Sequence, residues 1–240
     1  MVHLTGPTKE RTNGHVVGLD ISSQSISGGI DNSNSLFDLQ QLQSLNLANN
    51  VFSYGSHIPS AIGKLTNLRY LNLSNSYNYG EGKIPVEISQ LLYLDGVNIS
   101  APGKEWCQAI SSSLPDLRVL SLSNTLLSGP VDQSLAKLQS LSVIKLDNNY
   151  GISGPIPRFF ANFSNLREFS WDGNNVSAPF LCNEELLGSL PEFPNNGSLR
   201  SLVLPSTNFS GLLPGSIGNL KHLERLNFST TVSLDHFQNQ

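Results

Sequence analysis

Apolar residues recur along the chain at a regular interval, in the pattern Leu-x-x-Leu-x-Leu-x-x-Asn-x-Leu-x-Gly-x-Ile-Pro. The first residue of the central Leu-x-Leu falls at nine positions: Leu19, Leu45, Leu71, Val97, Leu120, Ile144, Phe169, Leu202 and Leu226. Successive positions lie 23 to 26 residues apart, except that 33 residues separate Phe169 from Leu202. A period of this length predicts a repeat architecture in which each copy forms one structural unit.

Each Leu-x-Leu alternates inward and outward side chains, as a short β-strand does. We therefore expect Leu45 and Leu47 in the core and Asn46 in solvent. Stacked copies predict a parallel sheet on the concave wall of a solenoid. The Gly- and Pro-rich second half of each copy, such as 154–157, predicts a tightly turning convex edge. One copy cannot bury its apolar face alone, so stability must come from neighbouring copies.

An asparagine stands three residues after the second leucine in several copies, at Asn50, Asn149 and Asn174. Its side-chain amide both donates and accepts hydrogen bonds. It is therefore suited to satisfying the peptide groups of adjacent turning coils that burial leaves without partners. The pattern predicts a structural role for these residues. In the seventh copy, Phe169 and Trp171 take the two leucine positions, which predicts core residues rather than a binding site.

Charge narrows the range of partners. Charged residues are only 13% of the sequence, and 14 basic against 18 acidic side chains give a net charge of −4, so nucleic acid is not an expected partner. Nowhere do eighteen apolar residues follow one another, which predicts no transmembrane helix in this chain. The opening residues 1–7 lack the apolar run of a secretory signal peptide.

The Leu-x-Gly-x-Ile-Pro halves resemble the plant-specific class of leucine-rich repeats, found in receptor kinases, receptor-like proteins and polygalacturonase-inhibiting proteins. Three strings narrow the resemblance: Gly-His-Val-Val-Gly-Leu-Asp at 14–20, Glu-Trp-Cys at 105–107 and Gly-Ser-Leu-Pro-Glu-Phe at 188–193. Together they resemble the amino-terminal ectodomain of plant immune receptor-like proteins of the wilt-resistance type. The resemblance implies an α/β-type repeat solenoid, a right-handed superhelix with its parallel sheet on the concave face.

The resemblance also implies a function. It implies a protein or peptide ligand, a co-receptor kinase as a partner, no cofactor, and a place on the extracellular face of the plasma membrane in plant defence. Two alternatives remain open. One is a secreted inhibitor of a cell-wall-degrading enzyme, of the polygalacturonase-inhibiting type, and the other is a truncated gene product without a function.

Three segments are expected. Residues 1–14 are a leader without the cysteine-containing cap of the family, residues 15–231 are a domain of about nine repeats with an insertion near 175–183, and residues 232–240 are a non-consensus tail. A gene-model error is the alternative explanation for the extra residues near 175–183. In the family, the cysteine equivalent to Cys107 has a partner in the next copy. This chain has Thr125 there, so we expect that bridge to be absent. Whether Cys107 pairs with Cys182 stays open.

Seven Asn-x-Ser/Thr sequons favour an extracellular glycoprotein in a chain this poor in charge. They are Asn72, Asn98, Asn162, Asn175, Asn196, Asn208 and Asn227. The register of the repeats places Asn72 and Asn98 at outward positions of the third and fourth strands. Glycans there would cover that part of the concave wall and move ligand contact toward the carboxyl terminus.

Four charged residues form a candidate ligand-binding patch on the sixth and seventh copies: Lys145, Asp147, Glu168 and Asp172. Neighbouring strands lie about 4.8 Å apart, which places Asp147 beside Asp172 and Lys145 diagonally across from Glu168. The alternative is ordinary solvated surface charge.

Catalysis is not expected. The five histidines are scattered, and the sequence has no His-Glu-x-x-His pair, nucleophile elbow or Walker phosphate loop. No metal site is expected either.

Overall fold

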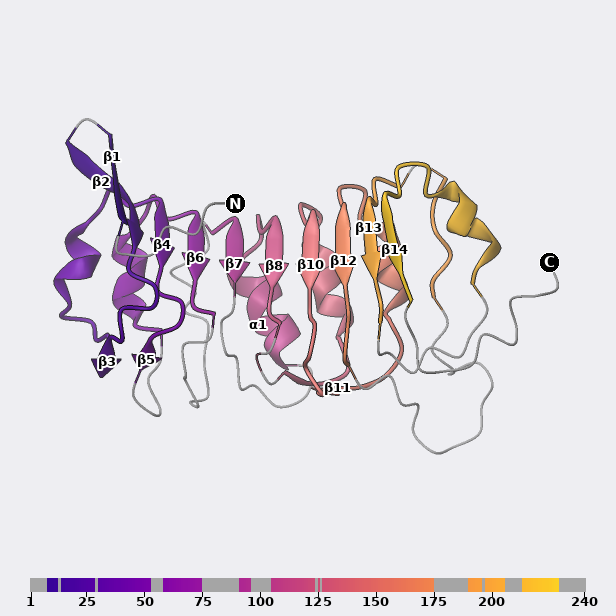
Figure 1. Cartoon of the computed structure of the whole chain (residues 1–240), viewed down its shortest axis with the longest axis horizontal. Coiled ribbons are helices and arrows are strands. Elements are labelled where there is room, and N and C mark those ends of the chain that lie inside the picture. The colour runs from indigo at the N-terminus through magenta and orange to yellow at the C-terminus, as the bar shows by residue number, and fades with distance from the viewer. Residues whose placement is uncertain are drawn as a thin grey trace.

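The protein is described from a computed structural model, which describes residues 8–12, 14–28, 30–52, 58–74, 91–95, 105–123, 125, 127–174, 190–195, 197–205 and 213–228. Ten strands form one long sheet, in which the strand order follows the sequence (Figure 1). The strands are β1 (Thr8–Thr12), β2 (His15–Asp20), β4 (Ser44–Asn46), β6 (Tyr70–Asn72), β7 (Tyr93–Asp95), β8 (Val119–Ser121), β10 (Val143–Lys145), β12 (Glu168–Ser170), β13 (Ser201–Val203) and β14 (Arg225–Asn227). From β2 onward every neighbouring pair is parallel.

Helical turns lie behind the strand row (Figure 1). The one α-helix with described bounds is α1 (Glu105–Ser113), and the 3₁₀ helices are η1 (Ser35–Asp38), η2 (Ser60–Lys64), η4 (Gln133–Lys137), η5 (Arg158–Asn162) and η7 (Gly215–Asn219). Two further parallel pairs join β3 (Ser27–Gly28) to β5 (Val51–Phe52) and β9 (Ser128–Gly129) to β11 (Gly151–Ile152). Where the structure describes a whole coil, the chain runs from strand to turn to helix, and the stacked parallel strands confirm the predicted solenoid.

The leucine positions of the repeat form the core. Leu45, Leu71, Leu120 and Ile144 are completely buried, and their cross-strand partners follow one another in register. Phe169 and Trp171 are also buried, as predicted, and their stacked rings lie 5.9 Å apart. Burial of a large apolar side chain contributes about 1.5–3 kcal/mol, so stacking of neighbouring coils is the main source of stability.

The buried asparagines perform the predicted structural task. Asn50 is completely buried, and its Oδ1 accepts hydrogen bonds from the backbone N–H groups of Gln24 and Ile26 in the preceding coil. Its Nδ2 donates to the carbonyl oxygens of Ile21 and Leu47. One side chain thus satisfies backbone groups of two coils that burial removes from water.

The fourth strand corrects one prediction. Its central residue is Leu94, which pairs with Leu71 on one side and Leu120 on the other, whereas the sequence pattern placed Val97 there. Leu94 and Val97 are both apolar, so either could stand at the strand centre. With Leu94 at the centre, Leu91 takes the upstream leucine position of the repeat, and it is completely buried. Consequently Asp95, and not Asn98, takes the register position beside Asn72.

The amino-terminal strand was not indicated by the repeat pattern. β1 pairs antiparallel with β2, with an irregularity between Glu10 and Arg11, and so covers the first edge of the sheet. The expected insertion near 175–183, Cys182 and the tail 232–240 lie outside the described residues. Among the residues described, no helix has the length and apolar character needed to cross a membrane.

Candidate ligand-recognition face

The solvent side of the ten-stranded sheet, here called the strand face, carries the outward side chains of every coil. In β4, β6, β8, β10 and β13 the residue before the central leucine and the residue after it are half-buried, while the central residue is buried. Because the strands are parallel and in register, equivalent residues of successive coils form straight rows across the sheet.

One row is apolar over four successive coils. Tyr70 pairs with Tyr93, Tyr93 with Val119, and Val119 with Val143. These four residues are here called the strand-face strip. Tyr93 is an exposed large hydrophobic residue with 37% of its surface accessible, whereas the central leucines beside it are fully buried. Exposed aromatic and aliphatic groups in a continuous row are the chemistry of a binding surface.

The tyrosine end of the strip is held in place by neighbours. The Tyr70 and Tyr93 rings are tilted by 48° with centroids 6.2 Å apart, a favourable arrangement for an aromatic pair. The Asn72 Nδ2 donates to the Tyr70 hydroxyl at 3.3 Å, and the Asn72 Oδ1 accepts from the Ser74 backbone at 2.8 Å. Asn72 therefore lies on the strand face, as predicted, with its glycan-accepting nitrogen directed at the strip.

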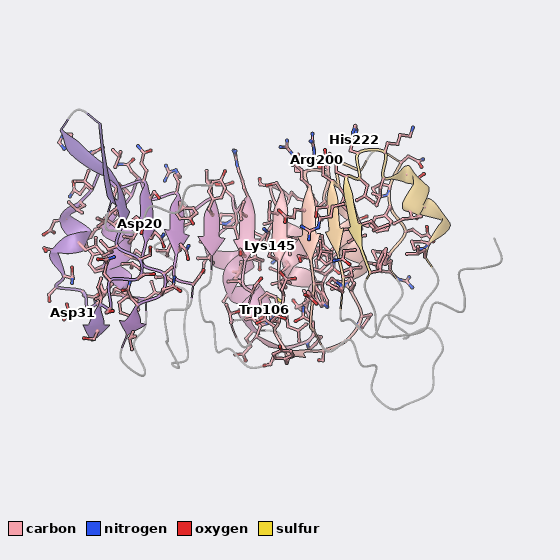
Figure 2. The ribbon with its side chains drawn as sticks, in the orientation of Figure 1. Asp20, Asp31, Trp106, Lys145, Arg200 and His222 are labelled. Atoms are coloured by element: carbon pink, nitrogen blue, oxygen red, sulfur yellow. The ribbon has the colours of Figure 1, made fainter. Side chains whose placement is uncertain are left out.

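The other end of the strip meets a charged pair. Val143 is in register with Glu168, and the Glu168 carboxylate lies 3.0 Å from the Lys145 ammonium. This is the predicted diagonal contact, and Figure 2 shows Lys145 near the middle of the strand row. The two side chains remain 38% and 35% exposed, so the pair contributes little to stability and is accessible to a ligand.

Asp147 is engaged within the scaffold. Its Oδ1 accepts from the Ser170 hydroxyl at 2.6 Å and from the Asp172 backbone N–H at 2.8 Å, and its Oδ2 accepts from the Ser123 hydroxyl at 3.1 Å. The carboxylate thus joins three successive coils. Asp172 follows in the next coil, as predicted, and meets Asp147 through its backbone. Lys145, Asp147, Glu168 and Asp172 do lie together, while their role in ligand binding stays a prediction.

The sequons fall in different environments. Asn162 is exposed at the end of η5, and Asn72 and Asn227 belong to β6 and β14. Asn98, Asn175, Asn196 and Asn208 lie outside the described residues. Asn72 and Asn162 differ most clearly, because one is on the strand face and the other on the helical side.

Cys107 is a free thiol inside the core. Burial raises its pKa to about 12, so it is protonated at neutral pH and a poor nucleophile. Its sulfur accepts the backbone N–H of Asp132 at 3.2 Å. Thr125 instead donates its hydroxyl to the Leu122 carbonyl and is buried. Within the described part of the chain, no group of three or more His, Cys, Asp or Glu residues is arranged to hold a metal.

Sequence reasoning missed the strip because it placed the fourth strand three residues too late. With Val97 at the centre, Tyr93 falls outside the strand and Tyr70 has no aromatic neighbour. A complete Leu-x-x-Leu at 91–94 was the available signal, since the same spacing occurs in the coils on both sides.

Comparison with known proteins agrees with this architecture. The family model described as Leucine Rich Repeat matches residues 41–65, 67–91 and 198–220. Receptor-like protein 6 of Arabidopsis thaliana is 32% identical over 238 residues, which cover 92% of this chain and 22% of that protein. The chain therefore carries leucine-rich repeats, and its sequence is similar to plant receptor-like proteins. It spans about a fifth of the relative's length.

Solved structures share the fold. The plant peptide hormone receptor RGFR1 in complex with RGF2 has a TM-score of 0.62 and 24% identity, over 95% of this chain and 41% of that one. The PEPR1–AtPEP1 structure has a TM-score of 0.58 and 25% identity, over 94% of this chain and 36% of that one.

Proposed function

We propose that this chain is a ligand-recognition portion of a plant cell-surface receptor-like protein, and that it binds a peptide or protein segment on the strand face. The observation that carries the proposal is the continuous strip from Tyr70 to Val143, which ends at an accessible ion pair. The relatives support it, since one solved neighbour is a peptide hormone receptor in complex with its hormone. A co-receptor kinase as the signalling partner belongs to the same proposal.

Ligand contact is centred on Tyr93, Val119 and Val143. Three strand spacings of about 4.8 Å separate the ends of the strip, so it fits about four residues of extended chain laid across the strands. A glycan on Asn72 would occupy the space beside Tyr70 and leave the rest of the strip open. Lys145 and Glu168 then meet charged or polar groups of the same ligand.

Selection of phage-displayed twelve-residue peptides on the immobilised chain tests the proposal. We expect selected peptides to be rich in aromatic and aliphatic residues and to lose about 30-fold or more in affinity on Tyr93→Ala, the loss typical of a binding hot spot. Tyr150→Ala is the matched control, because Tyr150 is 71% exposed but lies outside the strands. Charge reversal by Lys145→Glu should change affinity for peptides with acidic residues.

Two results would contradict the proposal. Peptides that bind the Tyr93→Ala and Tyr150→Ala variants with equal affinity would place the ligand away from the strip. Unchanged binding of acidic peptides to the Lys145→Glu variant would leave Lys145 and Glu168 as solvated surface charge.

A further inference from the structure

The helical side of the solenoid has a groove between η5 and η7. Its volume is about 560 Å³, and it lies among Arg158, Asn162, Pro191, Glu192, Leu213 and Pro214. Coil by coil, η4 and η5 occupy this flank, but the described residues 190–195 of the next coil contain no helix. The groove opens at that place, and its volume is in the range of about 300–1,000 Å³ that small-molecule sites occupy.

The wall of the groove combines flat apolar surface with hydrogen-bonding groups. Pro191 and Pro214 come from adjacent coils and are themselves buried, so the half-buried Leu213 provides the accessible apolar surface. Glu192 accepts a hydrogen bond from the Ser216 hydroxyl, which also accepts from the Phe193 backbone, so the carboxylate is fixed in position. Within the described residues the exposed Arg158 guanidinium has no hydrogen-bond or ion-pair partner.

Asn162 belongs to the wall of this same groove and begins the sequon Asn162–Ser164. It is exposed at the last position of η5, while the middle residue of the sequon, Phe163, is packed in the core. A sugar attached to Asn162 is therefore tethered beside the groove. Tethering gives it a high effective concentration there, so weak contacts are enough to hold it.

We propose that the groove holds the first N-acetylglucosamine residues of a glycan on Asn162. The apolar face of a sugar ring suits the half-buried Leu213. The Arg158 guanidinium has five N–H donors for the hydroxyl and acetamide oxygens, and the Glu192 carboxylate accepts from hydroxyl groups. The groove is thus a sugar-binding site occupied by the protein's own modification. The inference rests on the proposed cell-surface function, because only a secreted chain receives such a glycan.

The glycan then acts as part of the fold at the coil that has no described helix on this flank. It covers Leu213 and joins η5 to the coil of η7. On the strand face, a glycan at Asn72 would lie beside Tyr70, and Asn72 does not belong to the wall of the groove between η5 and η7. The two sequons therefore differ in their effect on stability.

Thermal unfolding of the chain, secreted from insect cells behind an added signal peptide, tests this difference. Ser164→Ala removes the Asn162 glycan and keeps the asparagine, and we expect the Tm to fall by about 3 °C. The matched variant Ser74→Ala removes the Asn72 glycan and should leave the Tm within about 1 °C. Unglycosylated protein from bacteria should give the same Tm with and without Ser164→Ala.

Arg158→Gln separates groove contact from other effects of the sugar. It should lower the Tm of the glycosylated protein by an amount close to that of Ser164→Ala, and have no effect once Ser164→Ala is present. Equal effects of Arg158→Gln in both backgrounds would overturn the proposal. So would mass spectra in which Asn162 is unmodified. If Tyr93→Ala did not weaken peptide binding while the Tm shifts were observed as expected, only the proposed ligand function would be overturned.

Discussion

At the scale of single residues, the buried asparagines connect the repeat sequence to the stacked coils. Asn149 is completely buried, and its side chain bonds with five backbone groups: its Oδ1 accepts from the N–H groups of Thr125 and Leu127, and its Nδ2 donates to the carbonyls of Leu122, Leu146 and Asp147. The pattern predicted this role because a polar residue at a fixed position among buried leucines needs partners, and only backbone groups recur in every coil.

Asn149→Ala should lower the free energy of unfolding by about 3 kcal/mol or more, since each buried backbone group left without a partner costs about 1–3 kcal/mol. Asn165→Ala is the control, because Asn165 is exposed and makes one hydrogen bond, to the Gln139 carbonyl. It should cost about 0.5 kcal/mol or less. Urea unfolding measures the free energy of unfolding of both variants. Similar losses for the two would contradict the structural role of the buried Asn149 hydrogen bonds.

The hydrogen bonds to the Asp20 carboxylate predict that the stability of the fold depends on pH. Partial burial by itself raises the pKa of Asp20, but the hydrogen bonds from Ser22 and Asn46 outweigh it and hold the pKa below its usual value. Because the pKa is lower in the folded state, ionised Asp20 stabilises the fold above the unfolded-state pKa of about 4. That contribution is lost as the pH falls through the folded pKa.

The difference in urea midpoint between the wild type and Asp20→Asn should therefore be largest near pH 6 and shrink toward pH 3. Ser22→Ala removes one hydroxyl donor to Asp20 and should give a smaller pH-dependent difference of the same sign. A constant difference across this pH range would mean that the charge of Asp20 has no part in stability.

At the scale of elements, the sequence predicted strand positions wherever one phase of the pattern was available. It failed at β7, where Val97 and Ile99 fit the Leu-x-Leu but Leu94, which is followed by Gly96, is the strand centre. Burial of Leu91 and Leu94 in the stacked coils distinguishes the two alignments. β1 has no repeat signature, because it pairs antiparallel with β2 and belongs to no coil. The Lys145–Glu168 contact followed from strand spacing, whereas the groove beside Asn162 lies where the described residues 190–195 contain no helix, a feature that no sequence motif indicates.

The second small sheet places a tight limit on Gly151 in β11. A Cβ there would lie 2.8 Å from the Leu127 carbonyl oxygen and 2.9 Å from the Ser128 Cβ in the preceding coil. Gly151→Ala should therefore separate β9 from β11 and lower the free energy of unfolding by about 2 kcal/mol. Gly218→Ala in η7 is the control, since nothing lies within 4 Å of the added carbon. Chemical denaturation of both variants tests this prediction. Equal denaturant midpoints for the two would contradict close packing at β11.

At the scale of the whole molecule, each coil contacts its sequence neighbours, so stability is local to pairs of coils. The two proposed sites follow this organisation. The strand-face strip is built from four successive strands, and the groove from turns that lie behind the sheet (Figure 1). Ligand and glycan therefore occupy opposite sides of the same stack, and each can be altered without removing the other.

The same organisation predicts that one substitution, made at equivalent positions of two repeats, lowers the free energy of unfolding by amounts that depend on how deeply neighbouring coils bury each position. Leu120 and Leu226 occupy the same central leucine position, but Leu120 is completely buried between β7 and β10, whereas Leu226 is 45% exposed in β14. Leu120→Ala should lower the free energy of unfolding by about 3 kcal/mol, because it opens a cavity that adjacent coils cannot fill. Leu226→Ala should cost less than half as much. Urea unfolding followed by circular dichroism measures both, and equal losses would show that stability does not depend on coil-to-coil burial.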